Sequence, residues 1–478
     1  MKILVANRGE IACRILRTLR EMGIPSVAVY TDPDAGAPHV ELADEAVALG
    51  PVDAYLRIDA ILSAARKTGA TAVHPGYGFL SQSAPFARAC REAGVTFVGP
   101  SPEAMVALGD KRGSRKTAED LGVPVVPGAR ECDTLDACKA AADRVGYPVL
   151  IKAAGGGGGK GMRLVKSAAD LAEGLEAAKR EAMASFGDDR IIVEKYVSPA
   201  RHVEVQILAD GKDAVALGER ECSLQRRYQK IIEEAPSPGI GDKTREGLFE
   251  SATKLARAVG YTNAGTVEFL VGPDGAHYFL EVNTRLQVEH PVTELLTGFD
   301  IVQAQVEIAR GGALPPRLPP RGHAIEARLN AEDPYNGFLP ASGRVLTLEW
   351  PQSPAVRVDS GIVEGFEVKP FYDPLLAKLI AFGTTREQAR RRLVEALRDT
   401  TILGVTTNQP LLVQILESDF FARGETFTTT LESTAWAEPP VPEEVIAAAR
   451  KALTARVNSH IDGLSDRYSP WTTIGRMR

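Results

Sequence analysis

Two acidic residues, Glu268 and Glu281, stand on either side of a predicted tight turn. They belong to the apolar segments 266–271 and 277–283, which flank Asp274-Gly275, a dipeptide typical of β-hairpin turns. A two-residue turn places Glu268 directly opposite Glu281, where like charges repel each other. A divalent cation removes this repulsion, and carboxylate oxygens are ligands for Mg²⁺ shared with substrate phosphates. The spacing therefore predicts a magnesium site, although a longer turn would shift the register by a residue or two.

Polar residues continue beyond this hairpin at every second position, as Asn283, Arg285, Gln287 and Glu289. Most of the positions between them are apolar. A guanidinium, an amide and a carboxylate that project in series form a pocket for a small anion, with the carboxylate as a candidate base. A solvated acidic strand face would explain a single carboxylate, but it does not account for the whole series.

A run of five glycines, residues 155–159, follows the predicted strand 149–153. Such a run costs much chain entropy, so a purely structural loop rarely uses it. Its bare N–H groups suit a flap that closes over phosphates. The segment is not a Walker A loop, because Lys160 is followed by Gly161 and because Ala154 takes the first glycine position. We therefore favour a phosphate lid over a flexible linker.

The scaffold that positions these residues is predicted to be of mixed α/β type. Short apolar strands alternate with helical stripes up to about residue 98, which indicates a parallel, doubly wound sheet. Residues 125–197 contain two strands, 149–153 and 191–197, around the glycine run and a helix from about 168 to 183. From His202 onwards the pattern becomes mostly antiparallel, with hairpin turns at Asp210-Gly211 and Asp274-Gly275.

Composition restricts the classes of function. The 478 residues are enough for two to four domains, and 44% hydrophobic with 25% charged residues is typical of a globular enzyme. The net charge of −6 argues against nucleic acid or an anionic membrane as the main partner. Five cysteines without metal-binding spacing fit a reducing compartment. We therefore expect a cytoplasmic protein without a membrane span.

Taken together, these segments closely resemble biotin carboxylase, a member of the ATP-grasp superfamily. The matching motifs are residues 6–12, 74–81, the glycine run, 281–291 and 328–333. The resemblance covers about residues 1–440 and implies an α/β fold in several parts. These are a doubly wound N-terminal domain (1–98), a connector (99–124), a small ATP-grasp lid domain (125–197), a larger α+β C-terminal domain with an antiparallel sheet (198–440) and a helical tail (441–478).

The resemblance also implies roles for individual residues, each by its place in a matching motif. The implied nucleotide site comprises Lys111, Lys152, Gly158, Gly159, Glu194, Lys195, Val197, His202, Gln225, Tyr228, Glu268 and Glu281. The implied metal ligands are Glu268, Glu281 and Asn283. Bicarbonate would lie at Lys230, Arg285, Gln287 and Val288, and biotin at Arg328 and Tyr77. The implied catalytic residues are Glu289 as base, Arg328, Arg285 and Lys230. Tyr228 stands where many family members carry histidine.

The implied activity is ATP-dependent carboxylation of biotin with bicarbonate through carboxyphosphate, in the presence of Mg²⁺ or Mn²⁺. It is the first half-reaction of an acyl-CoA carboxylase such as acetyl-CoA or propionyl-CoA carboxylase. The sequence has no Met-Lys-Met biotinylation site, so biotin would arrive on a biotin carboxyl carrier protein or on a further part of a longer subunit. The other implied partners are carboxyltransferase subunits and a second copy of the chain in a homodimer.

Alternatives remain open at this point. The chain could serve a pyruvate carboxylase, or it could be a related ligase that joins a carboxylate to an amine or makes carbamoyl phosphate. A nucleotide-binding regulatory subunit without chemistry is a further alternative, but sensing alone does not require a base beside an anion pocket. A dehydrogenase is disfavoured because no G-x-G-x-x-G opens the first strand–helix turn.

Overall fold

The computed structural model describes residues 1–155, 161–440, 443 and 447. The chain divides into two compact units, Met1–Ala435 and Trp436–Arg478, and all elements discussed below belong to the first. Glycines 156–159 and most of the expected tail helix lie outside the described residues. Within the described ranges, every helix is too short or too polar to cross a membrane.

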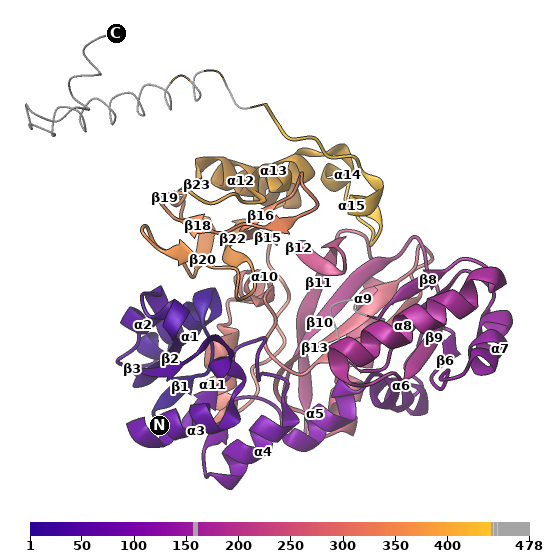
Figure 1. Cartoon of the computed structure of the whole chain (residues 1–478), viewed down its shortest axis with the longest axis horizontal. Coiled ribbons are helices and arrows are strands. Elements are labelled where there is room, and N and C mark those ends of the chain that lie inside the picture. The colour runs from indigo at the N-terminus through magenta and orange to yellow at the C-terminus, as the bar shows by residue number, and fades with distance from the viewer. Residues whose placement is uncertain (156–160, 441–442, 444–446, 448–478) are drawn as a thin grey trace, which may run out of the picture. The chain divides into compact units, whose positions relative to one another are not determined.

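The N-terminal sheet is parallel and has the order β3-β2-β1-β4-β5. Its strands are β1 Ile3–Val5, β2 Ser26–Thr31, β3 Glu45–Gly50, β4 Ala72–His74 and β5 Thr96–Phe97, and its main helices are α1 Gly9–Glu21, α3 Ile58–Thr68 and α4 Ala84–Glu92. In β1, Ile3 and Val5 pack with α1, whereas Leu4 packs on the other side with α3 and α4. Both faces are therefore covered by helices, which confirms the doubly wound prediction (Figure 1).

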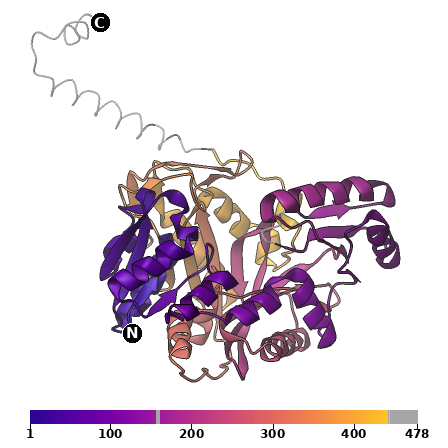
Figure 2. The same cartoon turned by 60° about the horizontal axis from the view of Figure 1, so that its bottom comes forward.

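A connector and a small antiparallel sheet follow. The connector contains α5 Pro102–Gly109 and α6 Lys111–Asp120. The small sheet has the order β6-β9-β7-β8, with β6 Gly128–Ala129, β7 Val149–Ala153, β8 Arg163–Val165 and β9 Ile191–Lys195, and its helices are α7 Leu135–Val145 and α8 Leu171–Phe186. Leu171, Leu175 and Ala178 of α8 pack on this sheet, and α8 runs along one of its faces (Figures 1 and 2). The β7–β8 connection carries the glycine run.

The large sheet is antiparallel, with eight strands in the order β14-β13-β10-β11-β12-β15-β22-β20. The strands are β10 Arg201–Asp210, β11 Ala214–Arg226, β12 Gln229–Ala235, β13 Thr262–Val271, β14 His277–Asn283, β15 His323–Asn330, β20 Val356–Ser360 and β22 Leu375–Gly383. In β10, Val203, Val205 and Ile207 pack with helix α9, Asp242–Ala258. The alternate positions, among them His202 and Glu204, face the other side. That polar side carries the candidate site.

The β13–β14 hairpin confirms the predicted pairing of Glu268 with Glu281, but by another route. The turn is one residue longer than expected, because Gly272 N–H donates to Ala276 O at 2.8 Å. Phe269 then pairs with Phe279, and a bulge that leaves Leu280 unpaired restores the predicted register at Glu268.

Further elements complete the described chain. They are α2 Pro38–Leu42, α10 His290–Thr297, α11 Ile301–Ala309, β16 Glu332–Asp333, β17 Leu339–Pro340, β18 Gly343–Arg344, β19 Thr347–Glu349, β21 Glu367–Val368, α12 Arg386–Asp399, β23 Thr401–Leu403, α13 Gln409–Glu417, α14 Asp419–Ala422 and α15 Thr430–Ser433. Strands β16 to β19, β21 and β23 form three two-stranded sheets.

Candidate active site

Two adjoining cavities bring together the predicted site residues that the structure describes, except Glu289, which lines neither cavity but contacts Lys230 and Arg328 of the second. The first, of about 220 Å³, is lined by Lys111, Lys152, Glu194, Lys195, Val197, His202, Gln225, Tyr228, Glu268 and Glu281 among others. The second, of about 900 Å³, is lined in part by Tyr77, Lys230, Asn283, Arg285, Gln287, Val288 and Arg328. Five residues line both cavities, namely Lys111, His202, Tyr228, Glu268 and Glu281. Gly158 and Gly159 lie outside the described residues.

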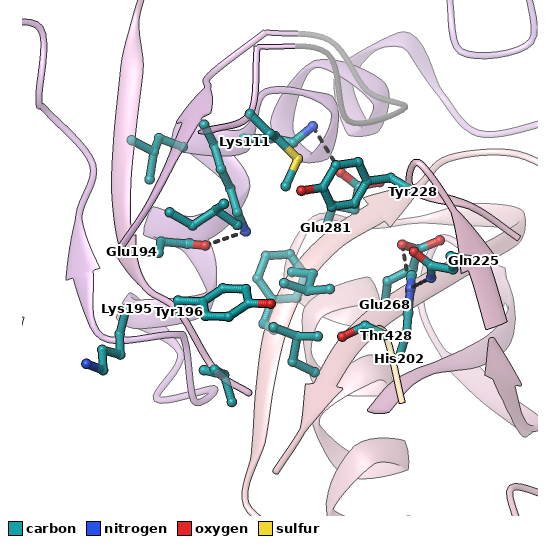
Figure 3. A pocket seen from close by; sticks show the side chains of 18 of the residues that line it. Lys111, Glu194, Lys195, Tyr196, His202, Gln225, Tyr228, Glu268, Glu281 and Thr428 are labelled. Atoms are coloured by element: carbon teal, nitrogen blue, oxygen red, sulfur yellow. Dashed lines mark hydrogen bonds and ion pairs between the residues drawn. The ribbon is translucent and has the colours of Figure 1, made fainter. Parts of the chain in front are cut away.

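Two lysines of the first cavity are neutralised by carboxylates of the cavity itself. Lys111 Nζ lies 3.0 Å from Glu281 Oε2, and Lys152 Nζ lies 2.5 Å from Glu194 Oε2 (Figure 3). Burial lowers the pKa of Lys111, but Glu281 and other nearby carboxylates outweigh this and raise the pKa above its usual value. The ammonium is therefore charged, and a polyphosphate would compete with Glu281 for it.

The rest of the first cavity suits a planar apolar group. Among its lining are Leu150, Met162, Ile192, Leu270, Phe279 and Leu280. Lys195, from the end of β9, directs its ammonium away from the cavity, where it donates to Gly146 O at 2.9 Å and Tyr147 O at 3.0 Å (Figure 3). Lys195 therefore offers the cavity its backbone and stem but not its charge. Neighbouring Tyr196 also lines this cavity and was not singled out from the sequence.

Glu268 is the centre of the passage between the cavities. Its Oε1 accepts hydrogen bonds from Lys230 at 2.9 Å, Asn283 at 2.9 Å and Gln287 at 3.2 Å, while His202 Nε2 lies 2.9 Å from Oε2. Burial raises the pKa of Glu268, but Lys230 and His202 outweigh this and hold the pKa well below its usual value. The carboxylate is therefore ionised at neutral pH. Together with Glu281 and the amide oxygen of Asn283, it supplies hard oxygen donors of the kind that Mg²⁺ prefers.

Glu289 lies behind the second cavity and has 0% exposure. Its two oxygens accept from Lys230 Nζ at 2.6 Å and from Arg328 Nη2 at 2.8 Å. Burial raises the pKa of Glu289, but Lys230 and Arg328 outweigh this and hold the pKa well below its usual value. Beside these two cations, Glu289 is thus an ionised but weakly basic carboxylate.

The polar series from Arg285 to Glu289 lies in a loop and not on an extended strand. Strand β14 ends at Asn283, and α10 begins at His290. The side chains still converge, because Arg285 donates to Gln287 Oε1 at 2.9 Å and to Asn283 Oδ1 at 3.1 Å. Alternation in the sequence therefore indicated residues that the structure brings together, although the strand it would require is not formed.

Tyr77 reaches the second cavity from a loop that Asn7 holds in place. Asn7 Nδ2 donates to Pro75 O and to Tyr77 O, both at 2.7 Å. Between these carbonyls, Gly76 has φ +60°, and a Cβ there would lie 2.9 Å from Asn7 Nδ2. Only glycine fits this close approach without displacing the asparagine.

Among the fully buried charged residues around the site that were not assigned from the sequence are Arg220, Glu204 and Glu233. Arg220 donates to Glu204 Oε1, Gln206, Thr293 and Thr266, and Glu204 also accepts from Lys230 at 2.5 Å. Glu233 accepts from Arg328 Nε at 2.6 Å. Alternation of polar and apolar residues along β10 was a signal for Glu204, whereas the segment around Glu233 gave none.

Family models match three consecutive parts of the chain. Residues 1–105 match "Biotin carboxylase, N-terminal domain", residues 110–317 match "Carbamoyl-phosphate synthase L chain, ATP binding domain", and residues 326–433 match "Biotin carboxylase C-terminal domain".

Known proteins of similar sequence and structure agree with these matches. Biotin carboxylase 1 of Bacillus subtilis is 45% identical over 90% of this chain and 98% of its own length. The mitochondrial methylcrotonoyl-CoA carboxylase subunit alpha of Dictyostelium discoideum is 43% identical over 100% of this chain and 70% of its own. In a solved structure, the biotin carboxylase domain dimer of Hydrogenobacter thermophilus 2-oxoglutarate carboxylase is bound to MgADP, ADP and bicarbonate. This domain is 42% identical with a TM-score of 0.88, over 91% of this chain and 99% of that chain.

Several of the acyl-CoA carboxylase relatives are considerably longer than this chain. It covers 60% of the rice methylcrotonoyl-CoA carboxylase subunit alpha and 65% of the Caenorhabditis elegans propionyl-CoA carboxylase alpha chain. The Bacillus relative, in contrast, is covered almost completely. The chain therefore belongs to the biotin carboxylase family of ATP-dependent ligases.

Proposed function

We propose that this chain carboxylates biotin with bicarbonate and ATP through carboxyphosphate, as the first half-reaction of an acyl-CoA carboxylase. The observation that carries the proposal is the pair of adjoining cavities that share Lys111, Glu268 and Glu281. A nucleotide in the first cavity and a small anion in the second would meet at these residues.

The first step is transfer of the γ-phosphoryl group of ATP. Lys111 and Lys152 exchange their carboxylate partners for phosphate oxygens and offset the negative charge that the transfer develops. Glu194, Val197, His202, Gln225 and Tyr228 line the side of the cavity proposed for the nucleotide. Gly158 and Gly159, expected as lid residues over the phosphates, lie outside the described residues. Glu268, Glu281 and Asn283 would hold Mg²⁺ or Mn²⁺, which would supply positive charge to offset the charge of the phosphates.

Bicarbonate binds between Arg285, Lys230, Gln287 and the backbone of Val288. A bound anion competes with Glu289 for the Lys230 ammonium, which now lies 2.6 Å from Glu289. Losing this partner makes Glu289 more basic, because a nearby cation is what lowers its pKa. Glu289 then accepts the bicarbonate proton, and the resulting oxygen attacks the γ-phosphorus to give carboxyphosphate and ADP.

Carboxyphosphate breaks down to CO₂ and phosphate beside biotin in the second cavity. The phosphate accepts the proton of the biotin ureido nitrogen, and Arg328 stabilises the enolate-like oxygen that forms. The nitrogen then attacks CO₂ to give carboxybiotin. Tyr77 forms part of the wall of the biotin site.

Assembly and location stay at the level of proposals. We propose a nucleotide lid in residues 125–197, between the N-terminal (1–98) and C-terminal (198–440) domains. The partners are a biotin carboxyl carrier, carboxyltransferase subunits and a second copy of the chain. The acceptor is an acyl-CoA such as acetyl-CoA or propionyl-CoA, with pyruvate as the alternative. A cytoplasmic location stays a prediction, since the Dictyostelium relative is named as mitochondrial.

The experiment that tests the proposal is phosphate release by the purified chain with ATP, Mg²⁺ and bicarbonate, with and without free biotin. We expect bicarbonate-dependent release that biotin stimulates, together with formation of carboxybiotin. Release that bicarbonate supports but biotin does not stimulate would favour a ligase that activates bicarbonate for another acceptor. ATP binding without any release would favour a regulatory subunit.

A further inference from the structure

Arg328 lies between two buried carboxylates, only one of which belongs to the proposed reaction. Its Nη2 donates to Glu289 at 2.8 Å, and its Nε donates to Glu233 Oε1 at 2.6 Å. Glu233 has 0% exposure and is not among the residues that line the two described cavities. It therefore holds the guanidinium from behind and does not touch a substrate there.

Glu326 lies directly opposite Glu233 on the neighbouring strand. Glu233 of β12 pairs in register with Glu326 of β15, so their side chains emerge on the same face of the sheet. Glu326 also has 0% exposure. Among the described residues, both oxygens of Glu326 and Oε2 of Glu233 have no hydrogen-bond partner. Two ionised carboxylates in this arrangement would repel each other in a medium that screens poorly.

The surrounding charges do not compensate a second anion here. The groups that face this pair are Arg328, Lys230, Glu289 and Lys378. Lys230 is shared among three other carboxylates. Lys378, on β22, donates to Val288 O at 2.8 Å, and its ammonium is shared with Glu10 at 3.3 Å and Asp359 at 3.9 Å. Arg328 is thus the one direct cationic partner of Glu233 in the part of the chain that the structure describes.

We propose that Glu233 is a positioning residue that orients Arg328 toward biotin, and that Glu326 stays protonated opposite it so that Glu233 keeps its negative charge. The proposal rests on the function proposed above for Arg328. A protonated Glu326 carries no negative charge, so it does not compete with Glu233 for the guanidinium. The charge of Glu233 stays available for the bond to Nε.

The proposal predicts a particular dependence on pH. Burial raises the pKa of Glu233 to about 7, although Arg328 lowers it. Burial also raises the pKa of Glu326 well above its usual value, and the charge of Glu233 raises it further. As the pH falls through about 7, Glu233 accepts a proton and its bond to Arg328 weakens. The biotin-dependent step then slows, whereas ATP hydrolysis without biotin does not require this orientation of Arg328.

The test compares two isosteric variants on the facing positions, Glu233→Gln and Glu326→Gln. Phosphate release by the full chain is measured with ATP, Mg²⁺ and saturating bicarbonate, with and without biotin, at pH values on both sides of 7. We expect E233Q to lower the biotin-stimulated rate about tenfold or more above pH 7, the scale seen when an orienting partner is removed. In E233Q the biotin-stimulated rate should no longer fall as the pH drops below about 7; this fall is called the acid limb. The rate without biotin should stay unchanged. E326Q should match the wild type in both rates and in the acid limb, because an amide replaces a neutral acid of the same shape.

Two results would overturn the inference while leaving the proposed function intact. One is an E233Q protein with the wild-type biotin-stimulated rate. The other is an E326Q protein whose acid limb moves to lower pH, because this would mean that Glu326 is ionised in the wild type. If E233Q fails to fold, the wild-type protein provides the test, through the ratio of phosphate release with biotin to release without it. A ratio that falls as the pH drops through about 7 supports the inference. A ratio that does not change with pH refutes it. A wild type without any biotin stimulation would instead refute the proposed function.

Discussion

Lys230 links three carboxylates of the site, and this arrangement sets the resting charges of the individual residues. Its ammonium lies 2.5 Å from Glu204, 2.9 Å from Glu268 and 2.6 Å from Glu289. Burial lowers the pKa of Lys230, but the three carboxylates outweigh this and raise the pKa well above its usual value. The charges of these residues thus satisfy one another, and we expect each substrate anion to replace an existing partner.

The first prediction at this scale concerns Arg328 and Glu289. Arg328→Ala and Glu289→Ala should each lower carboxybiotin formation by about two orders of magnitude or more, the scale of losing a charge stabiliser or a general base. Both variants should still bind ATP, because neither residue lines the first cavity. Carboxybiotin formation and nucleotide affinity are the measurements.

Arg391→Ala is the matched control for Arg328→Ala. Arg391 is an exposed arginine on α12 that pairs with Glu387. Its removal should leave both measurements unchanged. Near wild-type carboxylation in R328A or E289A would show that the role assigned to that residue is wrong.

Motifs in the sequence indicated residues that the structure brings to the two cavities, whereas the buried groups that contact them had no such signal. Lys230 and Arg328 stand in recognisable segments, but Glu233 follows Ile231-Ile232 and precedes another glutamate. The order of apolar and polar residues there does not show whether Glu233 is a buried partner of Arg328 or a carboxylate on the surface. The relation between Glu233 and Glu326 depends on how β12 pairs with β15, two strands nearly a hundred residues apart.

At the scale of elements, local periodicity predicted strands well and loop geometry poorly. The alternation in β10 correctly separated the core face from the polar face. In the β13–β14 hairpin, the turn and the Leu280 bulge each differ from the simplest hairpin by one residue, and the two differences cancel at Glu268. Packing of the completed sheet decides such compensation. Sequence spacing therefore predicted the pairing of Glu268 with Glu281, but neither the longer turn nor the bulge at Leu280.

The β11–β12 turn leads to a prediction about Tyr228. Arg226 pairs with Gln229, which leaves Arg227 and Tyr228 as central residues with φ +47° and +65°. Turns with two positive φ values favour glycine and asparagine, so this turn is strained. Tyr228 lines both cavities together with Lys111 and Glu281. We expect Tyr228→Asn to admit water to the passage and to raise the phosphate released per carboxybiotin severalfold, measured from both products.

Two controls separate the ring from the backbone strain. Arg227→Gly relieves the same turn and should raise the free energy of unfolding by about 0.5 kcal/mol or more without changing the ratio of products. Tyr228→Phe keeps the ring and should release as much phosphate per carboxybiotin as the wild type. A raised ratio of phosphate to carboxybiotin in R227G, or an unchanged ratio in Y228N, would show that the ring does not shield the passage.

At the scale of the whole molecule, long-range ion pairs join the N-terminal sheet to the rest of the first unit. Arg14 of α1 lies 2.9 Å from Glu294 of α10, and Lys378 of β22 lies 3.3 Å from Glu10 of α1. Gly361 packs so closely on α1 that a Cβ would lie 2.5 Å from Glu10 N. Local patterns predicted the parallel, doubly wound N-terminal part and the antiparallel part after it, but these contacts between residues far apart in the chain have no such signal.

The cavity proposed for the nucleotide spans the small sheet and the large sheet, so a ligand bound there should stabilise the molecule as a whole. Lys152 and Glu194 come from β7 and β9, whereas Glu268 and Glu281 come from β13 and β14. Mg-ATP at a hundred times its Kd should add about 2.7 kcal/mol to the free energy of unfolding, since it binds only the folded state. ATP with a chelator should add much less, because its phosphates meet Glu268 and Glu281 without a cation between them. Thermal unfolding measures both effects.

Glu281→Gln provides the control that assigns this metal dependence to the opposed carboxylates. It removes one of the two negative charges and frees Lys111 from the partner now 3.0 Å away. In this variant ATP alone should stabilise the protein more than it does in the wild type, and Mg²⁺ should add less. If the chelator has no effect on the wild type, or if E281Q keeps the full difference, Glu268 and Glu281 are not what couples the metal to the nucleotide.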